Sequence, residues 1–279
     1  MGADNILSFE AITVDGEYVT ANAEKNSDLF WALKGGGPST FAIVVSLTVK
    51  TFPEIPTAGT IININSTHTN DTKVFKKGLQ IFHNLANHYT DNGMFGYFEL
   101  SADRLHIAPL LGPRMDEKKF NQVVKPLFDQ LDAAKIPYSK YTKAFPTFFE
   151  FYMDMFEDEQ PNQNSVVGGR LFTHKDVAER GDKVVDALLI SAQPTKEVAG
   201  FSVGHIVNPG YGVPSADNAI HPKWRNASSF VVTNVLMTGL ETWEQKQQLE
   251  SIQTHVTGKA LREAGPDGAS YVNEVSRDC

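Results

Sequence analysis

The sequence predicts an α+β protein in which a large, mostly antiparallel sheet is covered by helices. Stretches with apolar residues three or four positions apart, the period of an amphipathic helix, alternate with short runs rich in β-branched and aromatic residues, which are typical of strands. Their order does not repeat regularly, which favours antiparallel pairing. With 279 residues, 41% of them apolar, the chain can bury a sizeable core in one large or two ordinary domains.

The first elements are a hairpin and a short helix. Residues 5 to 22 are predicted to form a β-hairpin, since Asp15-Gly16 suits a tight turn. The helix at 28 to 33 has an N-cap available at Asn26, Ser27 or Asp28. Apolar residues wrap most of its surface, so we expect it to be largely buried.

Three glycines, Gly35 to Gly37, end this helix. Glycine tolerates positive φ and has no Cβ, so the turn allows a left-handed helix stop and close approach by another group. Two interpretations stay open: an ordinary stop before a core strand, or a turn where the backbone approaches a flat or phosphorylated ligand. The strand that follows, within 41 to 52, alternates Ile43, Val45 and Leu47 with other residues, which predicts one buried face.

Pro53 and Pro56 interrupt strand pairing and mark a boundary to a second unit. Beyond it, apolar periodicity predicts helices at 75–89, 120–134, 177–188 and 241–263, and strands at 94–100, 104–111, 165–173, 198–207 and 228–237.

The segment 145–156 contains five phenylalanines, a tyrosine and two methionines. This much aromatic surface is enough to wall a ligand pocket, but apolar residues at helical spacing are more often core, and we expect core here. The acidic run Asp154, Glu157, Asp158 and Glu159 is expected to be a solvated face.

Composition excludes several classes of partner. Acidic residues outnumber basic ones, 33 to 25, the net charge is −8, and no Lys/Arg-rich block occurs. We therefore expect neither nucleic acid nor an anionic membrane as a partner. No apolar run approaches the ~20 residues of a bilayer-spanning helix, and the amino terminus does not resemble a signal peptide.

No metal site or hydrolase nucleophile is predicted. Cys279 is the only cysteine, so neither an internal disulfide nor a cysteine-based metal site is expected. His83 and His88 are five residues apart, unlike the i, i+4 histidines of zinc-binding helices. The sequence also lacks the Gly-x-Ser-x-Gly pattern of a nucleophile elbow.

Several segments together resemble a known family. Asp4 to Glu10, Thr13 to Gly16, Asp28 to Gly37 and Phe41 to Val49 are similar, in order and spacing, to the second half of the flavin domain of berberine-bridge-enzyme-like oxidases. These belong to the vanillyl-alcohol oxidase superfamily, which has a PCMH-type flavin domain. The variant Gly-Gly-Gly-Pro-Ser-Thr-Phe is most similar to fungal isoamyl-alcohol-oxidase-like proteins.

The resemblance implies a domain organisation. Residues 1–56 would be the C-terminal part of an FAD-binding domain, 57–270 a substrate domain with the antiparallel sheet, and 271–279 the start of a segment returning to the flavin domain. The main flavin-binding half, with the residues that attach FAD covalently, has no counterpart here. We therefore expect a chain truncated at both ends.

The resemblance also implies site residues. Tyr271-Val272-Asn273 resembles a Tyr-x-Asn motif whose tyrosine takes a proton from the substrate hydroxyl and whose asparagine lies near the flavin. The alternative for Tyr271, a strand tyrosine with a satisfied hydroxyl, stays open. The implied FAD contacts are Asp4, Asn5, Gly35, Gly36, Gly37, Phe41, Ile43, Val44 and Asn273.

Two functional hypotheses follow. The first is an FAD-dependent oxidase that removes hydride from an alcohol, sugar or secondary-metabolite substrate and passes electrons to oxygen. The second is an inactive remnant that at most binds a small molecule. The sequons at Asn65, Asn70 and Asn226 favour a secreted parent protein. No spacing rule identifies the substrate or the oligomeric state.

Overall fold

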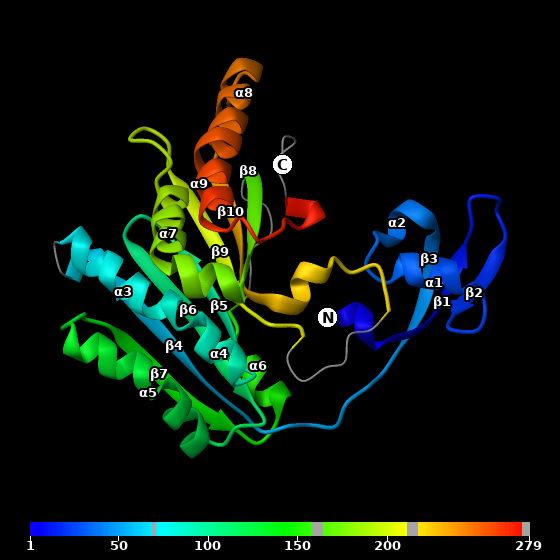
Figure 1. Ribbon diagram of the computed structural model, residues 1–279, viewed down its shortest axis with the longest axis horizontal. Helices are drawn as coiled ribbons and strands as arrows, with labels where there is room; N and C mark the ends of the chain where they lie inside the picture. Colours follow the sequence, from blue (N-terminus) through cyan, green and yellow to red (C-terminus); the bar gives the residue numbers. More distant parts are fainter. Residues whose placement is uncertain (69–70, 158–163, 211–216, 275–279) are drawn as a thin grey trace. The chain divides into compact units, whose positions relative to one another are not determined.

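The computed structural model of the chain, drawn in Figure 1, describes residues 1–68, 71–157, 164–210 and 217–274. Its contacts divide the chain into two compact units: residues 1–53 with 212–225, and residues 54–211 with 226–279. The predicted sequon at Asn70, the acidic residues Asp158 and Glu159, and Cys279 lie outside the described residues. No helix in the described segments is both long and apolar enough to cross a membrane.

The first unit contains a three-stranded antiparallel sheet of order β2-β1-β3. Its elements are β1 (Ile6–Ile12), β2 (Tyr18–Asn22), α1 (Ser27–Leu33), α2 (Pro38–Phe41) and β3 (Ile43–Val49). The predicted hairpin is confirmed, and Gly16 takes a φ of +83° in its turn. The one-turn helix α2 delays the start of the predicted strand from Phe41 to Ile43.

The prediction that α1 is largely buried is wrong. Leu33 is buried, whereas Leu29 and Phe30 are half-buried and Trp31 is 46% exposed. A helix of two turns on a three-stranded sheet has too little neighbouring surface to cover all its apolar residues. Asn26 occupies the N-cap position, but its side chain donates to the carbonyl of Thr20 instead of capping the helix.

The prediction that β3 has one buried face is also wrong. Ile43, Val45 and Leu47 are 68%, 53% and 50% exposed, and only Val44 packs partly against the core. β3 is an edge strand, so it has a sheet neighbour on one side alone. A register shift opposite β1 makes Val45 the extra residue of a bulge, which breaks the alternation that the sequence displays.

The second unit contains a seven-stranded antiparallel sheet of order β7-β4-β6-β5-β9-β10-β8, which confirms the predicted fold class. The five predicted strands correspond to β5 (Phe95–Leu100), β6 (Arg104–Pro113), β8 (Ser165–Thr173), β9 (Gly200–Ile206) and β10 (Ala227–Leu236). Sequence periodicity did not predict β4 (Thr57–Asn65) or β7 (Ser139–Phe145).

Helices cover one face of this sheet and enclose the main core, as Figure 1 shows for α3, α5 and α7. These helices are α3 (Thr72–Asn84), α4 (Ala86–Asp91), α5 (Glu117–Ala133), α7 (His174–Ala192) and α9 (Gly258–Ala264). Each long one begins at a side-chain cap, from Asp71, Asp116 or Thr173, which satisfies a backbone N–H of the first turn. The predicted helix at 241–263 comprises α8 (Trp243–Ile252), a π-turn and α9.

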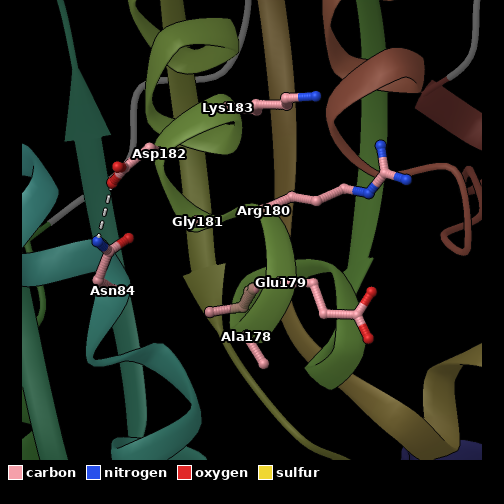
Figure 2. Close-up of a pocket in the computed structure, with 8 residues that line it drawn as sticks. Asn84, Ala178, Glu179, Arg180, Gly181, Asp182 and Lys183 are labelled. Carbon is pink, nitrogen blue, oxygen red and sulfur yellow. Dashed lines mark hydrogen bonds between the residues drawn. The ribbon is translucent and has the colours of Figure 1, made fainter.

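Helix α7 is kinked at Arg180, where the backbone leaves helical geometry. Figure 2 shows the shallow depression at this point, lined by Asn84 of α3 and by residues 177–183. Asn84 donates to Asp182 across it at 3.3 Å. A Cβ at Gly181 would collide with the Asn84 side chain, so glycine here lets the two helices come close.

Helix α6 (Phe148–Met155) packs on the other face of the sheet. The Phe151 ring lies over Gly59 of β4, and Phe145, Phe151 and Met155 are buried together. The expectation of core is therefore confirmed for this side of the helix. Its remaining apolar residues are exposed: Phe148, Phe149, Tyr152 and Met153.

A buried histidine makes the second unit sensitive to acid. His83 of α3 is fully buried, with its Nε2 atom 3.0 Å from Ser229 Oγ, and burial lowers its pKa to about 4. In the unfolded chain this pKa is about 6.5. The unfolded state therefore takes up a proton first as the pH falls below 6.5, and folding stability declines by about 1.4 kcal/mol per pH unit toward pH 4.

We expect the wild type to lose about 2 kcal/mol more than His83→Gln between pH 7 and pH 5, measured by urea denaturation at both values. The matched control is His255→Gln, which changes an exposed histidine and should keep the wild-type dependence. Equal losses in the wild type and His83→Gln would show that His83 is not the group responsible.

Candidate functional site

The face of the seven-stranded sheet opposite the main core carries a mixed aromatic and polar surface. In β5, Gly96, Phe98 and Leu100 are buried toward the helices, and the alternate residues are half-buried on the opposite side. β9 alternates in the same way. We call this surface the outer face and define it by Phe95, Tyr97, Glu99, Val203, His205, Phe230 and Val232.

Aromatic rings form a continuous row along the outer face. His205 is central: its ring centroid lies 5.3 Å from Tyr97, 5.9 Å from Phe95 and 6.1 Å from Phe230. Phe230 in turn makes an edge contact of 6.1 Å with Tyr271. Because β5, β9 and β10 are neighbours in the sheet, these residues meet although they are far apart in sequence. Phe230 is buried within the row, and the half-buried rings of Phe95, Tyr97 and His205 are the flat surface that a ligand could contact.

Tyr271 lies at the edge of the sheet beside β8. The chain reaches it through a β-bridge between Leu171 and Ala269 and a hydrogen bond of 3.2 Å from Ser270 Oγ to the Gly169 carbonyl. A short 3-10 helix, η5 (Val272–Glu274), follows. The Tyr271 side chain is 38% exposed, so it is accessible to a small molecule.

The structure brings the two predicted residues of the Tyr-x-Asn motif together. Asn273 Nδ2 donates a hydrogen bond of 3.0 Å to the Tyr271 phenol oxygen. A donor in this position stabilises negative charge on that oxygen. Asn273 therefore has a contact with Tyr271, whereas the resemblance implied a contact with flavin. The latter stays a prediction.

Next to this motif is an acid that the sequence did not single out. Burial raises the pKa of Glu274, and its Oε2 atom is buried without a hydrogen-bond partner among the described residues. The chain is close to β8 here, since a Cβ at Gly169 would lie 3.1 Å from the Glu274 carbonyl. No motif predicts this proximity.

A second group missed by sequence reasoning centres on His106 of β6. The side chain is almost completely buried, with Nδ1 2.7 Å from Asn63 Oδ1 and Nε2 3.0 Å from Glu157 Oε1. Glu99 of β5 is the direct cross-strand neighbour of His106. The acidic run was predicted to be a solvated face. Two of its residues form ion pairs instead: Asp154 pairs with Lys143, and Glu157 binds His106.

The predicted cofactor residues of the glycine turn lie in the first unit. Gly35 and Gly37 have φ values of +115° and +91°, which explains why glycine is needed. The close approach expected at this turn is made by the protein itself. A Cβ at Gly35 would lie 2.6 Å from the Ile220 side chain, and one at Gly36 would lie 2.6 Å from the Ala32 carbonyl.

Asp4, another predicted cofactor residue, is also engaged by the protein. Arg225 donates to both carboxylate oxygens at 2.7 Å, and Asn218 Nδ2 donates to Oδ1 at 2.8 Å. The Arg225 guanidinium holds the pKa of Asp4 far below its usual value. The neighbouring Asn5 donates its side-chain amide to the Met1 carbonyl.

The fit of these residues to FAD is partial. Phe41 and Ile43 are 45% and 68% exposed and present apolar surface suited to a flat ring system, and Val44 is partly buried behind them. Residues of the segment 218–225 occupy two other places in the predicted site. Arg225 binds the Asp4 carboxylate, and Ile220 fills the space over Gly35. The Asp4 carboxylate is therefore occupied by protein donors, whereas Gly35 is exposed and closed only on the side that Ile220 occupies.

The same segment borders a cleft of about 650 Å³ in the first unit, lined by Trp31, Asp217 to Pro222, and Arg225. Trp31 Nε1 donates to Asp217 at 2.9 Å. In the described parts of the chain, no group of three or more His, Cys, Asp or Glu side chains is placed to hold a metal ion.

Comparison with known proteins shows which proteins this chain resembles in sequence and fold. The chain is 27% identical over 279 residues to the FAD-linked oxidoreductase ZEB1 of Gibberella zeae, covering 99% of this chain and 48% of ZEB1. It is 26% identical over 280 residues to the FAD-linked oxidoreductase patO of Aspergillus clavatus, again covering 99% of this chain and 48% of the relative. No family model matches the chain.

Among solved structures, the VAO-type flavoprotein MtVAO713 of Myceliophthora thermophila has the same fold. The TM-score is 0.88 at 22% identity, covering 98% of this chain and 50% of that structure. Over nearly its whole length the chain is thus similar to fungal FAD-linked oxidoreductases, and its fold is that of about half of a VAO-type flavoprotein. It spans about half the length of the curated relatives that it matches.

Proposed function

We propose that the chain supplies the substrate-binding part of an FAD-linked oxidase, with the outer face as the substrate surface and Tyr271 as the base. The observation that carries this proposal is the Tyr271–Asn273 hydrogen bond at the end of the aromatic row. The substrate class is an alcohol, a sugar or a secondary metabolite, and oxygen is the proposed electron acceptor. Similarity to FAD-linked oxidoreductases supports the reaction type.

Tyr271 is suited to take the proton of a substrate hydroxyl. Its partial exposure allows contact with substrate, and the amide of Asn273 stabilises the phenolate that this role requires. The half-buried ring of His205, which stacks on the buried ring of Phe230, would orient a flat substrate against the sheet. A bound FAD would supply the hydride acceptor.

The residues that we propose to hold FAD are solvent-exposed residues of the first unit. Phe41 and Ile43 would lie against a flat ring. In the glycine turn, Gly35 and Gly36 are exposed and Gly37 is half-buried, so backbone of this turn is accessible to a ligand. Gly36, Val44 and Asn5 would shape the turn and strand around them. Asp4 and Gly35 would hold the neighbouring segment 218–225 in place.

The proposal is tested by adding FAD to the purified chain. Retained flavin is measured by its absorbance after gel filtration, and peroxide is measured with a panel of alcohols, sugars and polycyclic alcohols. If turnover is found, Tyr271→Phe should lower it by an order of magnitude or more, because a general base is lost. Retention of FAD should be the same in both proteins.

A matched control is Tyr18→Phe, which removes the hydroxyl of an exposed tyrosine in the first unit. It should leave turnover unchanged. Equal turnover in Tyr271→Phe and wild type would contradict the assignment of the base. Failure to retain FAD at all would favour the alternative, a chain that binds a small molecule without oxidising it.

A further inference from the structure

Glu99 occupies an unusual position for a carboxylate. It lies on β5, the central strand of the seven, and points to the outer face between two neighbouring strands. Its cross-strand partners are His106 on β6 and Val203 on β9. The residue is half-buried, so part of its hydration shell is already removed. Such a position disfavours a charged group unless something compensates the charge.

No side chain in the described parts of the chain compensates it. The Glu99 carboxylate has neither a hydrogen bond nor an ion pair with any described residue, whereas the nearby acids Asp154 and Glu157 bind Lys143 and His106. The contrast is informative because a partly buried carboxylate without a protein partner is a group that a ligand can satisfy.

His106 is the obvious candidate to neutralise Glu99, since it is directly opposite on the next strand. Both of its ring nitrogens, however, lie within 3.0 Å of oxygen atoms of other residues, Asn63 and Glu157. Arg104, at the end of β6, is directed to Asn63 at 3.5 Å. Neither side chain therefore forms a hydrogen bond or an ion pair with Glu99.

The neighbour of Glu99 on the outer face of β5 is an aromatic residue. Tyr97 is two residues before Glu99 on the same strand face, a separation of ~7 Å, and its ring contacts His205 at 5.3 Å. A carboxylate beside half-buried aromatic rings is the environment that proteins use to bind an ammonium group, through an ion pair and cation–π attraction. A neutral hydroxyl gains much less from the same surroundings.

We propose that Glu99 binds a protonated amine of the substrate, so that the outer face selects aromatic small molecules with a basic nitrogen. This inference rests on the proposed function in one respect, that the outer face is the substrate surface. It adds a specificity-determining residue and a substrate class that neither the fold nor the relatives define.

The experiment compares tyramine with tyrosol, which share a phenol ring and differ in an ammonium against a hydroxyl group. Binding to the full chain is measured by calorimetry and by ligand-observed NMR at pH 7, without FAD. We expect tyramine to bind at least 10-fold more tightly than tyrosol. Glu99→Gln, which keeps shape and removes charge, should abolish this preference.

The control Glu244→Gln removes an exposed carboxylate on α8 and should retain the preference. Circular dichroism and thermal melting of each variant confirm that the fold is kept. Equal binding of the two probes by wild type, binding of neither, or a preference that survives in Glu99→Gln would overturn the proposal.

The outcome is independent of oxidase activity because the binding measurement needs no flavin. A chain that prefers tyramine through Glu99 but never retains FAD would refute the oxidase and keep the amine subsite. A chain that oxidises alcohols with FAD but shows no charge preference would refute the subsite and keep the oxidase.

Discussion

Replacing Arg225 by alanine is expected to destabilise the first unit by about 2–4 kcal/mol at pH 7. The guanidinium makes two hydrogen bonds of 2.7 Å to the Asp4 carboxylate, and the Asp4 side chain is only 6% exposed. Removing Arg225 leaves the nearly buried Asp4 carboxylate with only the Met1 ammonium at 2.9 Å and the Asn218 amide as partners, and this loss of compensation is the main cost. Hydrogen exchange of the β1, β2 and β3 amides should accelerate on the order of 30-fold or more.

The effect of Arg225→Ala should depend on pH in a defined direction. Because Arg225 lowers the pKa of Asp4, the carboxylate stays ionised in the folded protein to lower pH than in the unfolded chain. The stabilisation is present in full above the unfolded pKa, about 4, and is lost as the pH falls below it. The difference between the variant and wild type should therefore shrink below pH 4.

A second substitution tests the mechanism. Asp4→Asn removes the charge that loses its arginine partner in Arg225→Ala, so the double variant should be more stable than the sum of the single effects predicts. Arg104→Ala removes an exposed arginine of the second unit and should not change exchange in β1–β3. Unchanged exchange in Arg225→Ala itself would refute a stabilising role for the pair.

Gly204→Ala should destabilise the second unit by about 3 kcal/mol, an overpacking effect. Gly204 of β9 lies between Phe98 of β5 and Val231 of β10. A Cβ there would overlap the ring of Phe98, which is completely buried and makes an edge contact of 5.4 Å with Phe82. Since alanine is intrinsically better than glycine in a strand, the loss would come from this overlap.

Urea denaturation measures the effect, and two further variants identify its cause. Gly2→Ala adds a methyl group where no atom lies within 4 Å and should be close to neutral. Phe98→Leu makes room over β9, so Gly204→Ala should cost less in that background than in the wild type. An equal cost in both backgrounds would show that the Phe98 ring is not the obstacle.

Helices of the second unit were predictable because their core contacts follow a local period. Phe75, Leu79 and Phe82 are spaced to form one stripe, and all three are buried as that spacing requires. β4 and β7 were missed because polar residues and glycine weaken their alternation, and pairing with neighbouring strands determines their extended state. β3 shows the opposite case, where the alternation is clear but no layer covers the strand.

The residues of the candidate site also fall into two groups, those that a local motif predicts and those that only the folded sheet brings together. Tyr271 and Asn273 lie two residues apart, so a short motif is enough to predict both as candidates, although it did not predict that they bond to each other. Glu99 and His106 belong to no motif. They become neighbours through the register of β5 and β6, which depends on the whole sheet.

The sequence by itself determined the hairpin, the helix stripes, the glycine turn and the acidic balance of the chain, because these depend on residues within a few positions of one another. Tertiary structure decided which side chains contact one another across long stretches of sequence. Arg225 meets Asp4 across 221 positions, and Ile220 fills the space that Gly35 leaves open. Likewise, the outer face consists of residues from three strands. The pairing of these strands in the sheet determines that their side chains point to the same side. Such contacts are set by the free energy of packing the whole unit, which no local pattern of residues records.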